Sequence, residues 1–202
     1  RKIDHVLKNE TPADVGILMT KRKIMNKYRE AIALVIKHEG GYVKDPVDRG
    51  GETFMGISRR FFPRWEGWSI VDIDHFDDQL DEMVENFYKV YFWDALNLSL
   101  VEDDFVASML LNVSVNQGKK SVSKKIQRIL NVKVDGDIGN ITLSALNSHN
   151  RDAFVYQFII ETVDLYTHII KKDRTQKKFI VGWLSRAMSL YSDYEYYKNS
   201  MR

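Results

Sequence analysis

The stretch HEGGYVKDPVDRGGETFMGI, residues 38–57, decides how the N-terminal half of this chain folds. Apolar side chains recur before it at helical spacing, and Glu39 is the next position on the same stripe, which runs through Ile32, Val35 and Ile36. Gly40 and Gly41 follow directly, and glycine readily takes the left-handed conformation of a helix end. The stretch therefore predicts a helix that ends at Glu39.

The rest of the stretch predicts a loop or a small β-hairpin region. Residues 42–57 hold Pro46, three glycines and two short apolar pieces among polar residues. Farther along, apolar residues recur at helical spacing from Leu80 to Tyr91, which predicts an amphipathic helix. Similar patterns predict further helices at 106–113, 119–131, 140–148, 152–171 and 177–197. We therefore expect a mainly α fold of the α+β kind, with a helical bundle and a small β-hairpin region after the first long helix.

Composition excludes several classes of protein. The chain has 202 residues, of which 44% are hydrophobic and 29% charged, as in a folded globular protein. Its formal net charge of +2 is far below that of a dedicated nucleic-acid binder. The absence of cysteine excludes disulfides, thiolate metal sites and a cysteine nucleophile. The apolar runs are too short for a membrane-spanning helix, and no secretory signal is visible.

Glu39 has the surroundings of a general acid. We expect its side chain to lie beside the core, where desolvation and the negative end of the helix dipole raise the pKa of the carboxyl group. A glutamic acid of this kind protonates the leaving oxygen in glycoside cleavage. Asp48 and Thr53 follow on the glycine-rich segment. They would orient a water or stabilise positive charge on the sugar, with inversion expected if Asp48 only positions the water.

Two other interpretations of this stretch stay open. Glu39 can be an ordinary solvent-exposed residue at a helix end, with the glycines serving turn geometry alone. Asp45, Asp48 and Glu52 can be compared with a calcium loop, but their spacing departs from that pattern and Pro46 stiffens the segment. The histidines are scattered without paired spacing, so we predict no metal site.

The same residues resemble a known family. Glu39 to Tyr42, Asp45-Pro46, Asp48, Gly50-Gly51, Thr53 and Gly56-Ile57 are similar to the signature of the glycoside hydrolase family 108 muramidases. Glu39, Asp48 and Thr53 also resemble the Glu–Asp–Thr constellation of phage-type lysozymes, although the Asp-to-Thr interval is one residue shorter here. The resemblance implies a lysozyme-like fold that hydrolyses the β-1,4 bond between N-acetylmuramic acid and N-acetylglucosamine.

The likeness continues toward the C-terminus. Tyr88, Tyr91 and Trp93, then Val115-Asn116 with Gly118, resemble further segments of the family. Gln127, Asp135-Gly136, Ile138-Gly139 and Thr142 resemble its C-terminal region, which is usually labelled peptidoglycan-binding. We therefore expect a lysozyme-like catalytic region with an N-terminal helical extension over 1–118. We expect a helical peptidoglycan-binding-like region over 119–202, packed with the first as one compact unit.

Three residues are candidates for holding sugars. Tyr42, beside the expected acid, and Trp93 each offer a flat aromatic face. The alternative for Trp93 is a place in the core, because it lies on a strongly periodic helix. Asn116 can hydrogen-bond an acetamido group, and its alternative role is a helix C-cap.

One basic segment has two interpretations. Its five cations are typical of a solvated helix face, with a polyanion site as the alternative; they are Lys119, Lys120, Lys124, Lys125 and Arg128.

The sequence therefore predicts an N-acetylmuramidase of the lysozyme type, with Glu39 as acid and no cofactor. Its expected partner is the glycan strand of peptidoglycan, with no nucleic acid and no membrane insertion. We expect a monomer that acts at the bacterial cell wall or periplasm. The alternative is a non-catalytic peptidoglycan-binding or secretion and envelope-assembly protein on the same scaffold.

Overall fold

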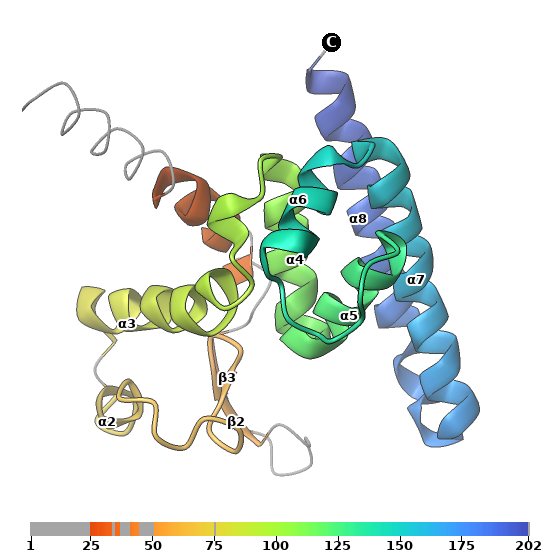
Figure 1. Cartoon of the computed structure of the whole chain (residues 1–202). Coiled ribbons are helices and arrows are strands. Elements are labelled where there is room, and N and C mark those ends of the chain that lie inside the picture. The colour runs from red at the N-terminus through yellow and green to blue at the C-terminus, as the bar shows by residue number, and fades with distance from the viewer. Residues whose placement is uncertain (1–24, 34, 37–40, 45–50, 75, 202) are drawn as a thin grey trace, which may run out of the picture. The chain divides into compact units, whose positions relative to one another are not determined.

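The computed structural model describes residues 25–33, 35–36, 41–44, 51–74 and 76–201 (Figure 1). The chain divides into two compact units, Arg1–Glu85 and Asn86–Arg202. Among the described residues, no helix is long and apolar enough to cross a membrane.

The first unit is built around two helices. Residues 25–33 and 35–36 are helical, and on the predicted stripe Ile32 and Val35 are buried, at 1% and 4% exposure, while Ile36 is half-buried. The second helix, α3 (Asp78–Tyr88), buries Leu80 and Val84. The Tyr28 hydroxyl donates a hydrogen bond to the backbone carbonyl of Glu85 and so ties the first helix to α3.

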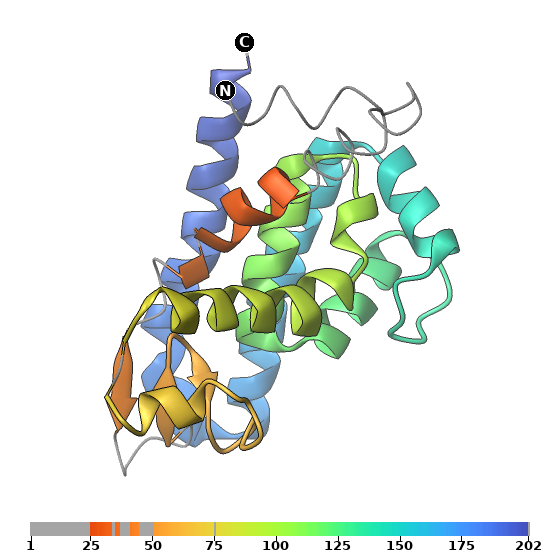
Figure 2. The ribbon, with the colours of Figure 1, turned by 90° about the vertical axis from the view of Figure 1, so that its left-hand side faces the viewer.

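A small antiparallel sheet occupies the predicted hairpin region. Its strands are β1 (Tyr42–Lys44), β2 (Glu52–Phe54) and β3 (Ile57–Ser58), in the order β1-β2-β3. Met55 and Gly56 join β2 to β3 with φ values of 46° and 78°. Two successive residues with positive φ match the tight hairpin turn whose twist suits the flanking strands. A short helix, α2 (Trp68–Val71), lies between the sheet and α3 in the chain (Figure 2).

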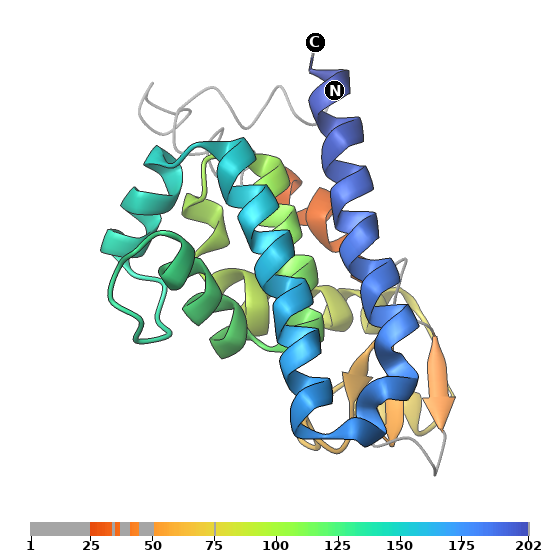
Figure 3. The same cartoon turned by 90° about the vertical axis from the view of Figure 1, so that its right-hand side faces the viewer.

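The second unit is helical. Its five main helices are α4 (Asp104–Gln117), α5 (Lys119–Ile129), α6 (Asn140–Ser148), α7 (Arg151–Lys172) and α8 (Ile180–Ser200). Its short elements are a π-helical turn, η2 (Lys89–Asp94), and the 3₁₀ turns η3 (Leu98–Leu100) and η4 (Arg174–Phe179). The long helices α7 and α8 pack side by side, as Figure 3 shows. The prediction of a mainly helical fold with one small sheet is confirmed.

Helix α4 forms the centre of the second unit. It contacts both α5 and α8. It buries seven residues, which form one broad face of the helix: Val106, Ala107, Met109, Leu110, Leu111, Val113 and Ser114. A helix with a broad buried face packs against several neighbours, and α4 thereby helps to position the helices that pack on it.

The prediction of a solvated basic face on α5 is wrong for Lys125. This side chain is 1% exposed. Its Nζ donates to Thr162 Oγ1 at 2.6 Å and to Gln117 Oε1 at 2.9 Å, and lies 4.6 Å from the Phe158 ring centroid. A signal was present in the sequence, because Lys125 lies three residues after the buried Val122 and thus on the apolar stripe of the helix.

Candidate functional site

Thr53 lies in the middle of β2. Its register partners are Val43 on β1 and Ser58 on β3. The side chain is half-buried, and within the described part of the chain its hydroxyl has no hydrogen-bond partner. A hydroxyl in this state is free to bond a water or a substrate atom.

Tyr42, at the start of β1, is part of a polar chain. Its hydroxyl donates to Glu52 Oε1 at 2.9 Å, and this hydrogen bond is the main cause of a raised Tyr42 pKa. The Arg59 guanidinium lies between two carboxylates, with Nε 3.3 Å from Glu52 Oε2 and Nη2 2.5 Å from Asp72 Oδ1. Its central carbon stands 4.4 Å from the centroid of the Trp68 ring. Glu52, considered above as a calcium ligand, is thus held by an arginine and a tyrosine.

The strand register separates Tyr42 from Thr53. Tyr42 pairs with Phe54, and Val43 pairs with Thr53. Successive side chains of a strand point to opposite faces. The sheet therefore carries Tyr42, Glu52 and Phe54 on one face and Thr53 on the other, so Tyr42 and Thr53 do not line one face together.

The two expected carboxylates, Glu39 and Asp48, lie outside the described residues. The expected burial of Glu39, its raised pKa and its distance from Asp48 stay predictions. The described chain resumes close to both, because Ile36 precedes Glu39 by three residues and Gly51 follows Asp48 by three.

A cavity of about 410 Å³ lies in the first unit. Its wall is mainly apolar and is formed by the first helix, the β2–β3 turn and α3: Arg29, Ile32, Ala33, Ile36, Met55, Asp81, Val84 and Glu85. Two of these lining residues are close in sequence to predicted catalytic residues. Ile36 precedes Glu39 by three residues, and Met55 follows Thr53 by two.

Asn116 is exposed in the last turn of α4. Its Nδ2 donates to the Asn112 carbonyl at 3.0 Å, and its Oδ1 accepts from Arg186 Nη1 of α8. The C-cap of α4 is Gly118, whose φ of 79° suits glycine. The structure thus gives Asn116 a fixed, outward amide, and the capping role belongs to another residue.

Trp93 is 0% exposed. Its indole N–H donates to Ser99 Oγ at 2.8 Å, which satisfies the polar end of the buried ring. In this structure the side chain therefore lies in the core of the second unit, the alternative given for it from the sequence.

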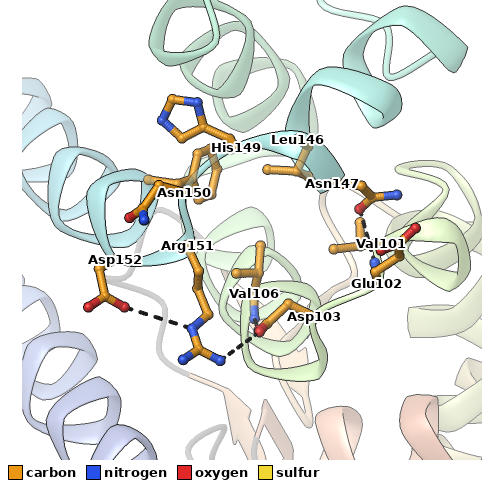
Figure 4. A pocket seen from close by; sticks show the side chains of 11 residues that line it. Val101, Glu102, Asp103, Val106, Leu146, Asn147, His149, Asn150, Arg151 and Asp152 are labelled. Carbon is orange, nitrogen blue, oxygen red and sulfur yellow. Dashed lines mark hydrogen bonds and ion pairs between the residues drawn. The ribbon is translucent and has the colours of Figure 1, made fainter.

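The second unit holds a larger cavity, of about 500 Å³ (Figure 4). It is lined by the segment that leads into α4 and by the α6–α7 junction: Val101, Glu102, Asp103, Val106, Leu146, Asn147, His149, Asn150, Arg151, Asp152 and Phe154. Sequence reasoning did not find this site. Its residues come from two segments that are about forty positions apart, and several of its polar residues are of the types that cap helices.

Ion pairs fix one side of this cavity. In Figure 4 the Arg151 guanidinium lies between Asp103 and Asp152, with Nη1 3.1 Å from Asp103 Oδ2. Its Nε donates to the Tyr194 hydroxyl at 3.2 Å, and the hydrogen bond to Asp103 is the main cause of its raised pKa. The Tyr194 hydroxyl in turn donates to Asp152, which chiefly lowers the Asp152 pKa. Burial raises the pKa of Tyr194 to about 12.

Comparison with known proteins finds similarity over both parts of the chain. Residues 32–118 match the family described as Glycosyl hydrolase 108, and residues 121–188 match the family described as Predicted Peptidoglycan domain. A solved structure of SagA from Brucella abortus is similar, with 25% sequence identity and a TM-score of 0.69, over 84% of this chain and 94% of that chain. No curated protein matches the chain. The chain therefore resembles the glycosyl hydrolase 108 family over residues 32–118 and the predicted peptidoglycan domain family over residues 121–188, which confirms the resemblance found in the sequence.

Proposed function

We propose that the chain is an N-acetylmuramidase, which cleaves the β-1,4 bond between N-acetylmuramic acid and N-acetylglucosamine with Glu39 as general acid. One observation carries this proposal. The glycosyl hydrolase 108 match spans Glu39, Asp48 and Thr53, and a predicted peptidoglycan domain follows it in the same chain. Together the two matches support a role of the peptidoglycan-hydrolase type.

The proposed chemistry needs a proton donor and a second polar group. Glu39 protonates the glycosidic oxygen as the bond breaks and the sugar gains oxocarbenium character. Asp48 and Thr53 hold the attacking water or stabilise the positive charge. The unpartnered Thr53 hydroxyl supports this role, because no other described group competes for it. These residues need no cofactor for the reaction.

The proposed sugar contacts lie away from Thr53. Tyr42 is on the opposite face of the sheet, so it would contact a different part of the glycan strand from the atoms that Thr53 contacts. Asn116 would bond an acetamido group through the part of its amide that Asn112 and Arg186 leave free. The burial of Trp93 gives no support to a sugar contact, and the proposal assigns it none.

The test is cleavage of purified cell-wall sacculi by the wild type and Glu39→Gln. Loss of turbidity and release of reducing ends should fall by about 10²- to 10⁴-fold, the usual contribution of a general acid. Glu30→Gln, an exposed residue on the same helix, is the matched control and should keep full activity. Fragment masses should show muramic acid at the new reducing ends.

Two results would contradict the proposal. Equal activity of Glu39→Gln and wild type would remove Glu39 as the acid. Sacculus binding by the wild type without any reducing ends would favour the non-catalytic alternative.

A further inference from the structure

We propose that the cavity of the second unit binds a peptide side chain of peptidoglycan that ends in a primary ammonium group, with the Glu102 carboxylate as its counter-ion. The choice of peptidoglycan as the polymer rests on the proposed function. The choice of an ammonium group rests on the lining of the cavity.

The cavity is preformed by hydrogen bonds between side chains and backbone. Asn147 clamps the segment before α4, because its Oδ1 accepts from the Glu102 backbone N–H at 3.0 Å and its Nδ2 donates to the Leu100 carbonyl at 2.9 Å. Asp103 caps α4 through the Val106 N–H at 2.9 Å, and Asn150 caps α7 through the Ala153 N–H at 2.9 Å. A ligand would thus bind without first ordering the wall, which reduces the entropic cost of binding.

The charges leave one carboxylate without a cationic partner. Asp103 is paired with Arg151, and Asp152 is paired with Lys198 at 3.2 Å. Glu102 is exposed, and its carboxylate has no ion pair or hydrogen bond within the described chain. The cavity therefore carries a net negative charge at Glu102, which attracts a cation.

The inner wall suits a hydrocarbon chain. Val101, Val106, Leu146 and Phe154 line it, each no more than 6% exposed. Methylene groups packed on this wall would leave water while the charged end stays at the rim, as lysine side chains do at protein surfaces. A volume of about 500 Å³ is within the range of small-ligand sites.

An anionic ligand is the competing possibility, and the contacts disfavour it. Among the described residues that line the cavity, Arg151 is the one arginine or lysine. Its Nη1 and Nε are already engaged by Asp103 and Tyr194. A ligand carboxylate would also face Glu102 and Asp152, and like charges at close range cost free energy.

The experiment uses the full chain. The probe is Nα-acetyl-lysine N-methylamide, compared with its Nε-acetylated analogue and with Nα-acetylglycine as an anion. Amide chemical-shift changes measured by NMR should centre on residues 101–106 and 146–154. Acetylation of the amine, or Glu102→Gln, should each weaken binding about five-fold, the upper range for an exposed ion pair.

Asp193→Asn is the matched control, since this exposed carboxylate lies on α8 outside the cavity lining. It should leave probe binding unchanged. Equal binding of the acetylated analogue, unchanged binding by Glu102→Gln, shifts centred elsewhere, or tighter binding of Nα-acetylglycine would each overturn the proposal. These readouts do not depend on cleavage, so a failure of the muramidase proposal in the sacculus assay is a separate result.

Discussion

For a single residue, Lys125 shows how burial in the core changes the pKa of a side chain. Its ammonium is buried among Gln117, Thr162 and the Phe158 ring, with no carboxylate in direct contact. Burial is the main cause that lowers its pKa, to about 8, while the more distant Glu161 raises the pKa and Arg128 lowers it further. The residue is therefore largely charged at neutral pH and loses its proton in mild alkali.

Lys125 gives a prediction for stability. Its pKa is about 8 in the folded chain, whereas that of an unperturbed lysine is 10.5. Between these two pH values the unfolded state binds more protons at Lys125 than the folded state does. The contribution of Lys125 to the free energy of unfolding therefore increases as pH rises. The difference in unfolding free energy between wild type and Lys125→Met should therefore rise by ~3 kcal/mol from pH 7.5 to pH 10.5. Urea unfolding at several pH values measures this difference.

A control separates this effect from general alkaline unfolding. Lys120→Met removes an exposed lysine from the same helix. The difference in unfolding free energy between wild type and Lys120→Met should change little with pH. If it changes as much as the difference for Lys125→Met, burial of Lys125 is not the cause.

Thr53 gives a second prediction at the residue scale. Thr53→Val keeps the shape of the side chain and removes only the hydroxyl, which has no partner among the described residues. If that hydroxyl acts in the transition state, kcat on sacculi should fall about 100-fold with little change in KM or melting temperature. Thr167→Val, on α7, is the control. A fall in stability without a change in kcat would mean that Thr53 serves the sheet alone.

At the scale of elements, buried Gln127 holds the connection between α5 and α6. Its Nε2 donates to Asp135 Oδ1 at 2.7 Å and to the Asp137 carbonyl at 2.9 Å, and its Oε1 accepts from the Gly136 N–H at 2.8 Å. Gly136 has a φ of 89°, where a side chain would be strained. One amide thus fixes a turn that carries no regular secondary structure.

Gln127→Leu should therefore destabilise the chain strongly. Leucine has a similar volume but leaves these partners without their hydrogen bonds, at a cost of about 2 kcal/mol or more. The amides of 134–138 should exchange with solvent much faster in the variant. Arg128→Leu, at the adjacent exposed position, should leave their exchange rates nearly unchanged. Similar exchange rates in the two variants would show that the turn does not depend on Gln127.

At the scale of the whole molecule, family boundaries and packing boundaries differ. The family matches separate at residues 118 and 121, whereas the compact units separate after Glu85. Helix α4 explains the difference, because it lies within the first family match and contacts α5 and α8 in the second unit. The expected division into 1–118 and 119–202 stays a prediction.

Two fragments test which boundary governs folding. Residues 86–202 retain α4, and residues 119–202 lack its seven buried residues. Since one buried Val, Leu or Met side chain contributes about 1.5–3 kcal/mol, the loss is comparable with the whole stability of a domain. We expect 86–202 to melt cooperatively by circular dichroism and 119–202 to show no cooperative transition. Equal melting of both fragments would contradict this role of α4.

Much of the fold could be predicted from local patterns. The helix before Glu39, the hairpin region and α4 to α8 follow from apolar spacing and from glycines at turns, which depend on residues close in the chain. The end of α3 at Tyr88 was missed, because apolar periodicity continues to Tyr91 while the backbone changes to a π-helical turn. Periodicity reports which side chains face the core, and it does not report the hydrogen-bonding pattern.

The amino-acid sequence alone was enough for the mainly helical fold with one small β region and for the family resemblance, both of which are confirmed. It also proposed the candidate acid, Glu39, which stays a prediction. Tertiary structure alone decided three features: the opposite faces of Tyr42 and Thr53, the burial of Lys125, and the cavity around Glu102. The physical reason is that strand pairing, desolvation and cavities depend on side chains that meet in space from distant positions. A local sequence pattern does not contain information about contacts between residues that are distant in the chain.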